Sequence, residues 1–151
     1  IKTKTSWTSA KRLDVIHCSL NEVITNWLPN KAAVEQIFVA KGADSALKLG
    51  MARGVAMQTC AGKGLDLTEI SARQVKKAVT GTGAADKTQV AAMVEKLLNI
   101  KPEGLDASDA LAIAIAGINM WPNFSIDTTN LPTGNGLKSA IEAALLKEQR
   151  R

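Results

Sequence analysis

The chain contains few aromatic residues. Only 3% of its 151 residues are aromatic, and tyrosine is absent. Proteins that bind single-stranded nucleic acid without sequence preference stack successive bases on several aromatic side chains. The composition therefore argues against an extended base-stacking surface.

Histidine and cysteine are also scarce. His17 is the only histidine, and Cys18 and Cys60 are the only cysteines. A zinc site of the usual His and Cys type and a Ser-His-Asp triad both lack the residues they require. The two cysteines have no CxxC partner and fall within predicted helices, so we expect buried, reduced thiols in a cytosolic protein. We expect His17 to lie at the surface of its helix.

Long apolar segments are missing as well. No run of residues is long and uncharged enough to cross a bilayer. The first residues, Ile1-Lys2-Thr3-Lys4, include neither an initiator methionine nor the apolar core of a signal peptide. We therefore expect a cytoplasmic protein without a membrane partner, and a sequence that begins in the middle of a domain.

Basic residues outnumber acidic ones. The formal net charge is +5 and the sequence pI is about 9.4. Such an excess suits an anionic partner, most often nucleic acid, although charge alone is a weak signal. Hydrophobic residues make up 46% of the chain, which is ordinary for one globular domain with a real core.

The hydrophobic pattern predicts helices that alternate with short strands. Apolar runs at 32–40 and 65–70 are typical of strands, and helical spacing of apolar residues covers 9–28, 87–98 and 137–150. Further helices are expected at 44–61, from Ser71 onward and at 105–116, the last apolar all round and therefore central. This alternation indicates an α/β fold with a parallel component. Two strands make a poor sheet, so Ile1–Thr3 is expected to be the tail of another strand, with further strands before it.

The predicted helices after Ser71 and at 44–61 carry further signals at their starts, and the second also carries one on its surface. Ser71 is expected to cap the basic helix that follows it, and Asp44 or Ser45 the helix at 44–61. In that second helix, Ala46, Gly50 and Gly54 recur every four residues. This smooth strip permits either tight packing within the fold or self-association.

A single carboxylate, Glu35, interrupts the first predicted strand. Its neighbours Val34, Ile37 and Val39 indicate burial on both faces. A buried, unpaired carboxylate costs several kcal/mol, so Glu35 requires a cation, a proton or a strand end that opens to solvent. A half-exposed glutamate without a function is the alternative.

Two further carboxylates begin the apolar helix at 105–116. Asp106 and Asp109 are three residues apart and share a helix face. Helix capping by Asp106, with Asp109 in the first turn, would explain both without any catalytic role. If the buried helix instead brings them to the end of the strand that holds Glu35, the acidic cluster suits Mg²⁺ or Mn²⁺. Two such ions about 4 Å apart activate a water and stabilise the leaving oxygen of a phosphodiester.

These residues resemble the RuvC family of bacterial Holliday junction resolvases, which belong to the ribonuclease H-like superfamily. The resemblance covers about residues 1–116. It is specific because the matching segments follow one another in the right order and with similar spacing. They are Val34–Phe38, Ala43–Gly50 with Ala52–Ala56, Ala72–Lys76, Gly81–Gly83 with Lys87, and Asp106–Ala112.

The resemblance implies an α/β, ribonuclease H-like mixed sheet flanked by helices. It also implies a homodimeric, Mg²⁺-dependent endonuclease that cuts four-way junction DNA symmetrically in recombination and repair. Glu35, Asp106 and Asp109 fall on three of the family's four acidic metal-binding and catalytic positions. The glycine-containing helix at 44–61 falls on the dimer interface, and the RuvA–RuvB branch-migration complex is an implied partner.

The resemblance also assigns residues to DNA. Lys76 and Lys87 fall on basic positions that contact DNA near the active site, and Phe38 on an aromatic position that meets a base at the junction centre. Arg73, on the same predicted helix as Lys76, is a further candidate for a phosphate contact. The segment Gly81-Thr82-Gly83 lacks the order of a nucleotide phosphate loop, so a contact to a DNA phosphate is the better interpretation.

One departure from the family pattern affects the predicted activity. The family's fourth carboxylate, an aspartate on its first strand, has no counterpart in this sequence, and the first strands of the family's sheet are absent too. The sequence thus predicts a nuclease domain at 1–118 that lacks its N-terminal strands, followed by a loop and helix at 119–151. A non-catalytic, junction-binding module with an incomplete site is the alternative. A metabolic α/β enzyme is disfavoured because no cofactor fingerprint is present.

Overall fold

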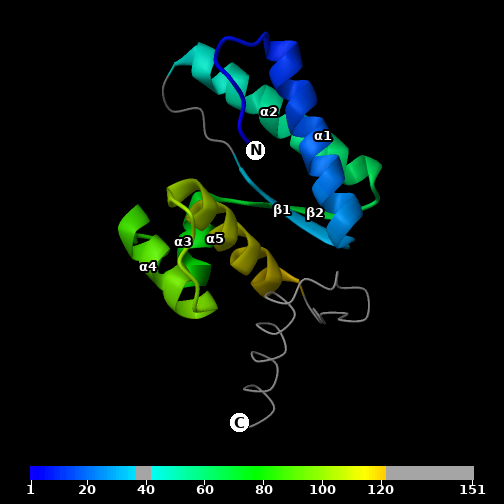
Figure 1. Cartoon of the computed structure of the whole chain (residues 1–151). Coiled ribbons are helices and arrows are strands. Elements are labelled where there is room, and N and C mark those ends of the chain that lie inside the picture. Colours follow the sequence, from blue (N-terminus) through cyan, green and yellow to red (C-terminus); the bar gives the residue numbers. More distant parts are fainter. Residues whose placement is uncertain (37–41, 122–151) are drawn as a thin grey trace.

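The computed structural model describes residues 1–36 and 42–121 and has an α/β layer architecture. Figure 1 shows a small sheet with α1 and α2 on one side and α3, α4 and α5 on the other. Helices α2 and α5 contact the strands directly. The elements are α1 (Ser9–Trp27), β1 (Lys31–Glu35), α2 (Ala43–Gly62), β2 (Asp66–Ile70), α3 (Ala72–Thr80), α4 (Lys87–Leu98) and α5 (Leu105–Met120). The α/β architecture predicted from the sequence is confirmed.

The two strands of the described sheet are parallel. Their register pairs Lys31 with Asp66 at one end and Glu35 with Ile70 at the other. The predicted second strand is confirmed with a start one residue later. The first predicted strand begins one residue earlier, at Lys31, and ends at Glu35, while residues 37–40 of that prediction lie outside the described residues.

Two expectations about the sheet are wrong. Ile1–Thr3 forms no strand, because no neighbouring strand in the described part of the chain is paired with it. Val34 is only half-buried and Glu35 is exposed, so β1 is not buried on both faces. The sequence left three alternatives for Glu35: a cation, a proton, or a strand end that opens to solvent. The structure shows the third, because Glu35 is exposed at the end of β1.

The core lies between the sheet and α3, α4 and α5. Ile70 and Val94 are fully buried at its centre. The helix at 105–116 was expected to be central because it is apolar all round, yet Leu105 and Ala114 of α5 are exposed. The described elements cover only one side of this helix, so only its face of small residues is buried: Ser108, Ala112, Ala116 and Gly117.

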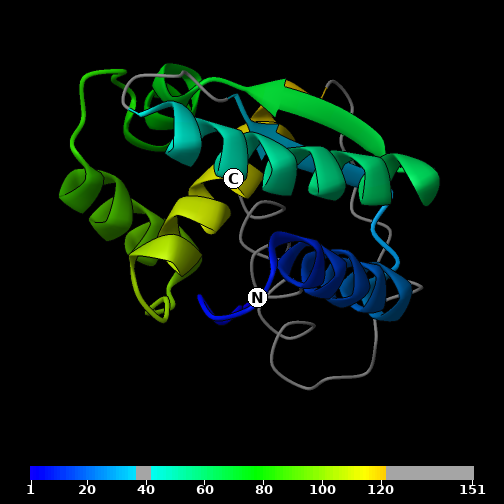
Figure 2. The ribbon, with the colours of Figure 1, turned by 90° about the horizontal axis from the view of Figure 1, so that it is seen from above.

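Helices α1 and α2 pack against each other on the side of the sheet opposite to α3, α4 and α5. Figure 2 shows this pair from above. A hydrogen bond of 2.8 Å joins His17 Nδ1 to the hydroxyl of buried Thr59. That hydroxyl donates its own hydrogen to the carbonyl of Val55 at 2.7 Å, so the imidazole is the donor. His17 is exposed, as expected, but it also joins the two helices.

The cysteines differ from their prediction. Cys18 is exposed rather than buried, because it lies on the outer side of α1, where its thiol is 3.7 Å from Asp14. Cys60 is half-buried, and burial raises the pKa of its thiol. Both are free thiols.

Close contacts hold the C-terminal part of α5 against the sheet. A side chain at Gly117 would place its Cβ 2.9 Å from that of Ala33 on β1, so only glycine permits this approach. Trp121, directly after α5, donates its indole N–H to the hydroxyl of Thr68 at 2.8 Å. The ammonium of Lys31 lies 5.4 Å from the centre of the Trp121 ring. The position of α5 across β1 is thereby fixed.

Of the two helix starts predicted to carry a side-chain cap, one agrees with the structure and one does not. Ser71 caps α3 in a capping box with Gln74, as predicted. Helix α2 instead begins after Gly42, without a side-chain cap. The prediction of a cap at Asp44 or Ser45 is therefore wrong, because Gly42, whose φ of 76° suits glycine, makes the turn that starts the helix.

No helix in the described ranges is long and apolar enough to span a membrane.

The capping difference predicts a difference in stability. Ser71→Ala removes the acceptor of the Gln74 backbone N–H and should lower the free energy of unfolding by about 1 kcal/mol. Ser45→Ala is the matched control, and its effect should stay within about 0.5 kcal/mol. Urea denaturation of both variants checks this, and equal losses would contradict the assignment of the cap.

Candidate active site

Glu35 lies where β1 ends, and its register partner Ile70 lies where β2 ends. In parallel α/β folds, ligands bind beside the carboxyl ends of the strands. The sequence produces such an edge because Ser71 starts α3 immediately after β2. Glu35 thus stands at the edge of the sheet where a site is expected.

A cavity of about 270 Å³ opens at this edge. It combines two carboxylates, from Glu35 and Asp109, with two ammonium groups, from Lys76 and Lys87. Its remaining wall is apolar and comes from Ala72, Val75, Val90, Ala112 and Ile113. Four of the residues that the sequence singled out therefore come together from β1, α3, α4 and α5.

One ion pair is formed inside this group. The ammonium of Lys87, the first residue of α4, lies 3.5 Å from Oδ2 of Asp109. The Lys87 side chain is 75% exposed and the Asp109 side chain 44%. Exposed pairs contribute about 0–1 kcal/mol, so a ligand can replace this one at little cost.

Asp106 is placed differently from the other two acids. Helix α5 begins after Gly104, and neither Asp106 nor Asp109 caps it. The capping explanation for the two aspartates is therefore wrong, because Gly104 already occupies the N-cap position. Asp106 is exposed in the first turn and is not among the residues that line the cavity.

Glu35, Asp106 and Asp109 do not together form a set of metal ligands in this structure. Across residues 1–36 and 42–121, no group of three His, Cys, Asp or Glu side chains is close enough together to hold a metal ion. The structure brings Glu35 and Asp109 to one cavity and leaves Asp106 outside it. The catalytic and metal-binding roles of all three residues stay predictions.

The predicted DNA-binding residues are also divided. Lys76 and Lys87 line the cavity. Arg73 is exposed in the first turn of α3, and its Cγ would lie only 2.7 Å from a Cβ at Gly83. Its aliphatic part thus packs against the turn between α3 and α4. Phe38 lies outside the described residues.

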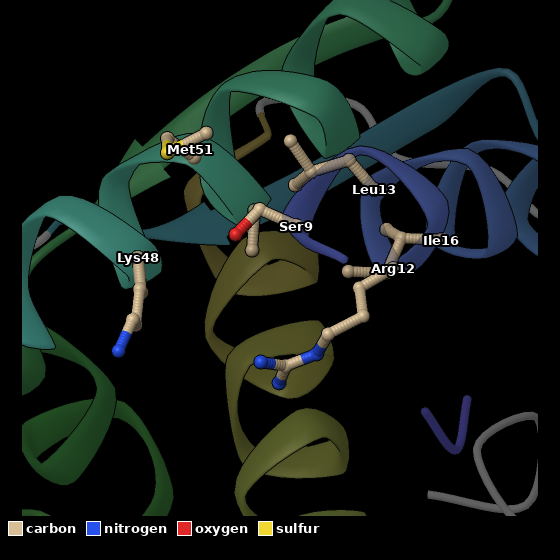
Figure 3. A pocket seen from close by; sticks show the side chains of 7 residues that line it. Ser9, Arg12, Leu13, Ile16, Lys48 and Met51 are labelled. Atoms are coloured by element: carbon tan, nitrogen blue, oxygen red, sulfur yellow. The ribbon is translucent and has the colours of Figure 1, made fainter. Parts of the chain in front are cut away.

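A second pocket, whose charged residues are basic, lies between α1 and α2. Figure 3 shows the hydroxyl of Ser9 and the charged ends of Arg12 and Lys48 around it. The cavity holds only about 50 Å³. Lys48 is already paired with Asp44 at 2.5 Å, and Arg12 donates to the hydroxyl of Thr3 at 3.2 Å. We interpret this pocket as a packing gap between the helices.

Sequence reasoning missed one residue next to the candidate site. Arg53 of α2 donates from Nε to the backbone carbonyl of Glu35 at 3.0 Å and also pairs with Glu69 of β2. Its position within the segment that resembles the family was the available signal. Its role at the end of β1 depends on the fold, which places α2 over both strands.

Comparison with known proteins identifies the family. A family model described as crossover junction endodeoxyribonuclease RuvC matches residues 1–117. The protein of that name from Marinobacter nauticus is 52% identical over 113 residues, which are 74% of this chain. The chain spans 64% of the length of that relative.

Solved structures agree with this result. The structure of Thermus thermophilus RuvC matches with a TM-score of 0.70 and 33% identity, over 77% of this chain and 71% of the other. T. thermophilus RuvC in complex with a Holliday junction substrate matches with a TM-score of 0.73 and 32% identity, over 77% and 72%. The ribonuclease H-like fold predicted from the sequence is thereby confirmed, and the chain belongs to the RuvC family of crossover junction endodeoxyribonucleases.

Proposed function

We propose that this protein is a structure-selective endonuclease that resolves four-way DNA junctions in recombination and repair. The observation that carries the proposal is the cavity at the end of β1, where Glu35 and Asp109 face Lys76 and Lys87. Carboxylates suit a metal ion and ammonium groups suit a phosphate, so the site has both parts needed for metal-dependent phosphodiester hydrolysis. The related protein from T. thermophilus was solved with a Holliday junction substrate, which supports the choice of DNA.

The donor atoms fit Mg²⁺, with Mn²⁺ as an alternative. Mg²⁺ is commonly held by one or two carboxylates, several waters and substrate phosphates, and the cavity offers the carboxylates of Glu35 and Asp109. When bound, the metal would activate a water and stabilise the leaving oxygen. Asp106 is proposed as a further ligand because it precedes Asp109 by three residues on the same helix.

The lysines supply binding and charge stabilisation. Lys76 and Lys87 would donate hydrogen bonds to oxygens of the scissile phosphate, where negative charge increases in the transition state. Lys87 now balances the charge of Asp109, and a metal at Asp109 would free its ammonium for the phosphate. Arg73 and Phe38 are proposed as further DNA contacts.

A second function is favoured by one observation. Asp106 lies outside the cavity, and no three-acid group exists in the part of the chain that the structure describes. A junction-binding module without catalysis would need only the lysines. This candidate predicts salt-sensitive binding of junctions without cleavage.

Helix α2 is the proposed dimer interface. Nothing lies within 4 Å of a Cβ added at Gly50 or Gly54, so tight packing within the described fold does not explain these glycines. Leu47 and Leu49 on the same helix are exposed. A second copy of the chain is therefore the proposed partner of this strip.

The RuvA–RuvB branch-migration complex is proposed as a partner and the cytoplasm as the location. The nuclease domain is proposed to comprise residues 1–118, with 119–151 as a C-terminal part of loop and helix. The loop predicted from Asn119 does not begin there, because α5 continues to Met120. Residues 122–151 lie outside the described residues.

The first functional prediction concerns Glu35. Glu35→Gln removes a metal-binding charge while preserving size, and should lower the cleavage rate of a synthetic four-way junction in Mg²⁺ by about 10²-fold or more. Junction affinity, measured by gel shift without divalent metal, should be unchanged. Glu22→Gln, on exposed α1, is the control.

The same assay decides between the two candidate functions. The protein as its gene encodes it should cut the junction only when Mg²⁺ is present. Tight junction binding without any cutting would refute the nuclease and favour the binding module. Failure to bind junctions at all would refute both.

The second functional prediction concerns Lys76. Lys76→Ala should weaken junction binding and reduce the slope of log affinity against log salt by about 1, because one phosphate contact is lost. Lys63→Ala removes an exposed lysine that precedes β2, at the other end of the strands, and should leave the slope unchanged. Titrations at several salt concentrations check this, and equal slopes for both variants would count against Lys76.

The third functional prediction concerns the dimer. Gly54→Leu adds bulk at an open position, so the protein should fold normally but self-associate less, as measured by sedimentation velocity. Thr25→Leu adds comparable bulk to an exposed position of α1 and should leave self-association intact. An unchanged dimer in Gly54→Leu would remove α2 from the interface.

A further inference from the structure

Arg53 is bonded to both strands near the point where β1 ends. Its Nε donates to the backbone carbonyl of Glu35 at 3.0 Å, and its Nη2 pairs with the carboxylate of Glu69. The Arg53 side chain is only 21% exposed. Because a guanidinium holds its donors in a rigid plane, one side chain joins α2, β1 and β2 in a fixed geometry.

The Glu35 carbonyl depends on this bond. The N–H of Gln36 donates to the carbonyl of Ile70 at 2.9 Å, so the backbone groups of Gln36 face β2. Backbone groups of successive strand residues face opposite edges, so the carbonyl of Glu35 faces away from β2. Arg53 supplies the partner that β2 does not, and so restricts the peptide plane that follows Glu35.

Arg53 and the candidate cavity lie on opposite faces of the sheet. Glu35 and Ile70 are register partners, and paired residues of parallel strands point to the same face. Ile70 is buried in the core with α3, α4 and α5, and Glu35 lines the cavity formed by those helices. Glu69, the neighbour of Ile70, points to the other face, where Arg53 of α2 meets it. Arg53 is not among the residues that line the cavity, and its direct link to the cavity residue Glu35 is the hydrogen bond to the backbone of that residue.

We infer that Arg53 is a positioning residue, which acts with Glu69 to hold the end of β1 so that the Glu35 carboxylate points into the cavity. Its guanidinium is engaged with protein groups and shielded, and it is not a DNA contact. The catalytic consequence of this role rests on the proposed function. The structural consequence, a restrained end of β1, does not.

The test compares Arg53→Ala, Arg53→Lys and Lys48→Ala in the protein as its gene encodes it. Lys48→Ala is the matched control, since it also breaks an ion pair on α2 but touches neither strand residue. Three quantities are measured: hydrogen exchange of the Gln36 amide, affinity for a four-way junction without divalent metal, and the single-turnover cleavage rate in Mg²⁺.

Arg53→Ala should accelerate exchange of the Gln36 amide at least about tenfold, because the end of β1 opens more often. Its cleavage rate should fall by about 10²-fold, the effect expected from a misplacement of about 1 Å, while junction affinity stays within about twofold. Arg53→Lys keeps the charge but has one nitrogen for two partners, and should be intermediate in both exchange and rate. Lys48→Ala should match the wild type in all three.

The outcomes separate this inference from the proposed function. Unchanged exchange at Gln36 in Arg53→Ala would overturn the positioning role, whatever the protein does to DNA. Faster exchange with a normal cleavage rate would overturn the link to Glu35. A wild-type protein that never cuts junctions would refute the proposed nuclease, and faster exchange in Arg53→Ala would then still support the restraint on β1.

Discussion

The close crossing of α5 over β1 is the contact on which the candidate site depends. Gly117 allows the helix to approach Ala33 to a distance that any larger residue would prevent, and Trp121 bonds to Thr68 just beyond the helix end. Because a helix is rigid over a few turns, fixing its C-terminal part also fixes where Asp109 lies. Asp109 reaches the cavity with Glu35 through this contact, although the two residues are far apart in the sequence.

The balance of charge in the cavity explains how such a site stays stable before it binds anything. Two carboxylates in one cavity repel each other, and two lysines offset that repulsion. Lys87 and Asp109 are exposed enough that their ion pair is weak. A metal ion and a phosphate can therefore take over the partners of these groups without a large cost in folding free energy.

The sequence predicted the parts of the fold that depend on local signals. Periodicity gave α4 with its observed bounds, and the capping rule gave Ser71, because both depend on residues a few positions apart. The sequence did not predict correctly how far the residues of β1 and α5 are buried, because the burial of a residue depends on which elements cover it. It also missed Arg53, whose partners Glu35 and Glu69 are 18 and 16 residues away. Within the candidate site, Glu35 and Asp109 line one cavity and Asp106 does not, so the described residues do not form the predicted cluster of three acids.

Helix α2 connects two features that the sequence treated separately. Its Arg53 is bonded to the backbone carbonyl of Glu35, and its Gly50 and Gly54 have open space beside them. Because a helix of this length moves as a unit, a displacement of α2 would also displace the guanidinium of Arg53. The carbonyl of Glu35 would then lose its partner, and the carboxylate at the end of β1 would lose its restraint. The geometry of the candidate site therefore depends on how α2 is held, including by any partner that covers its open strip.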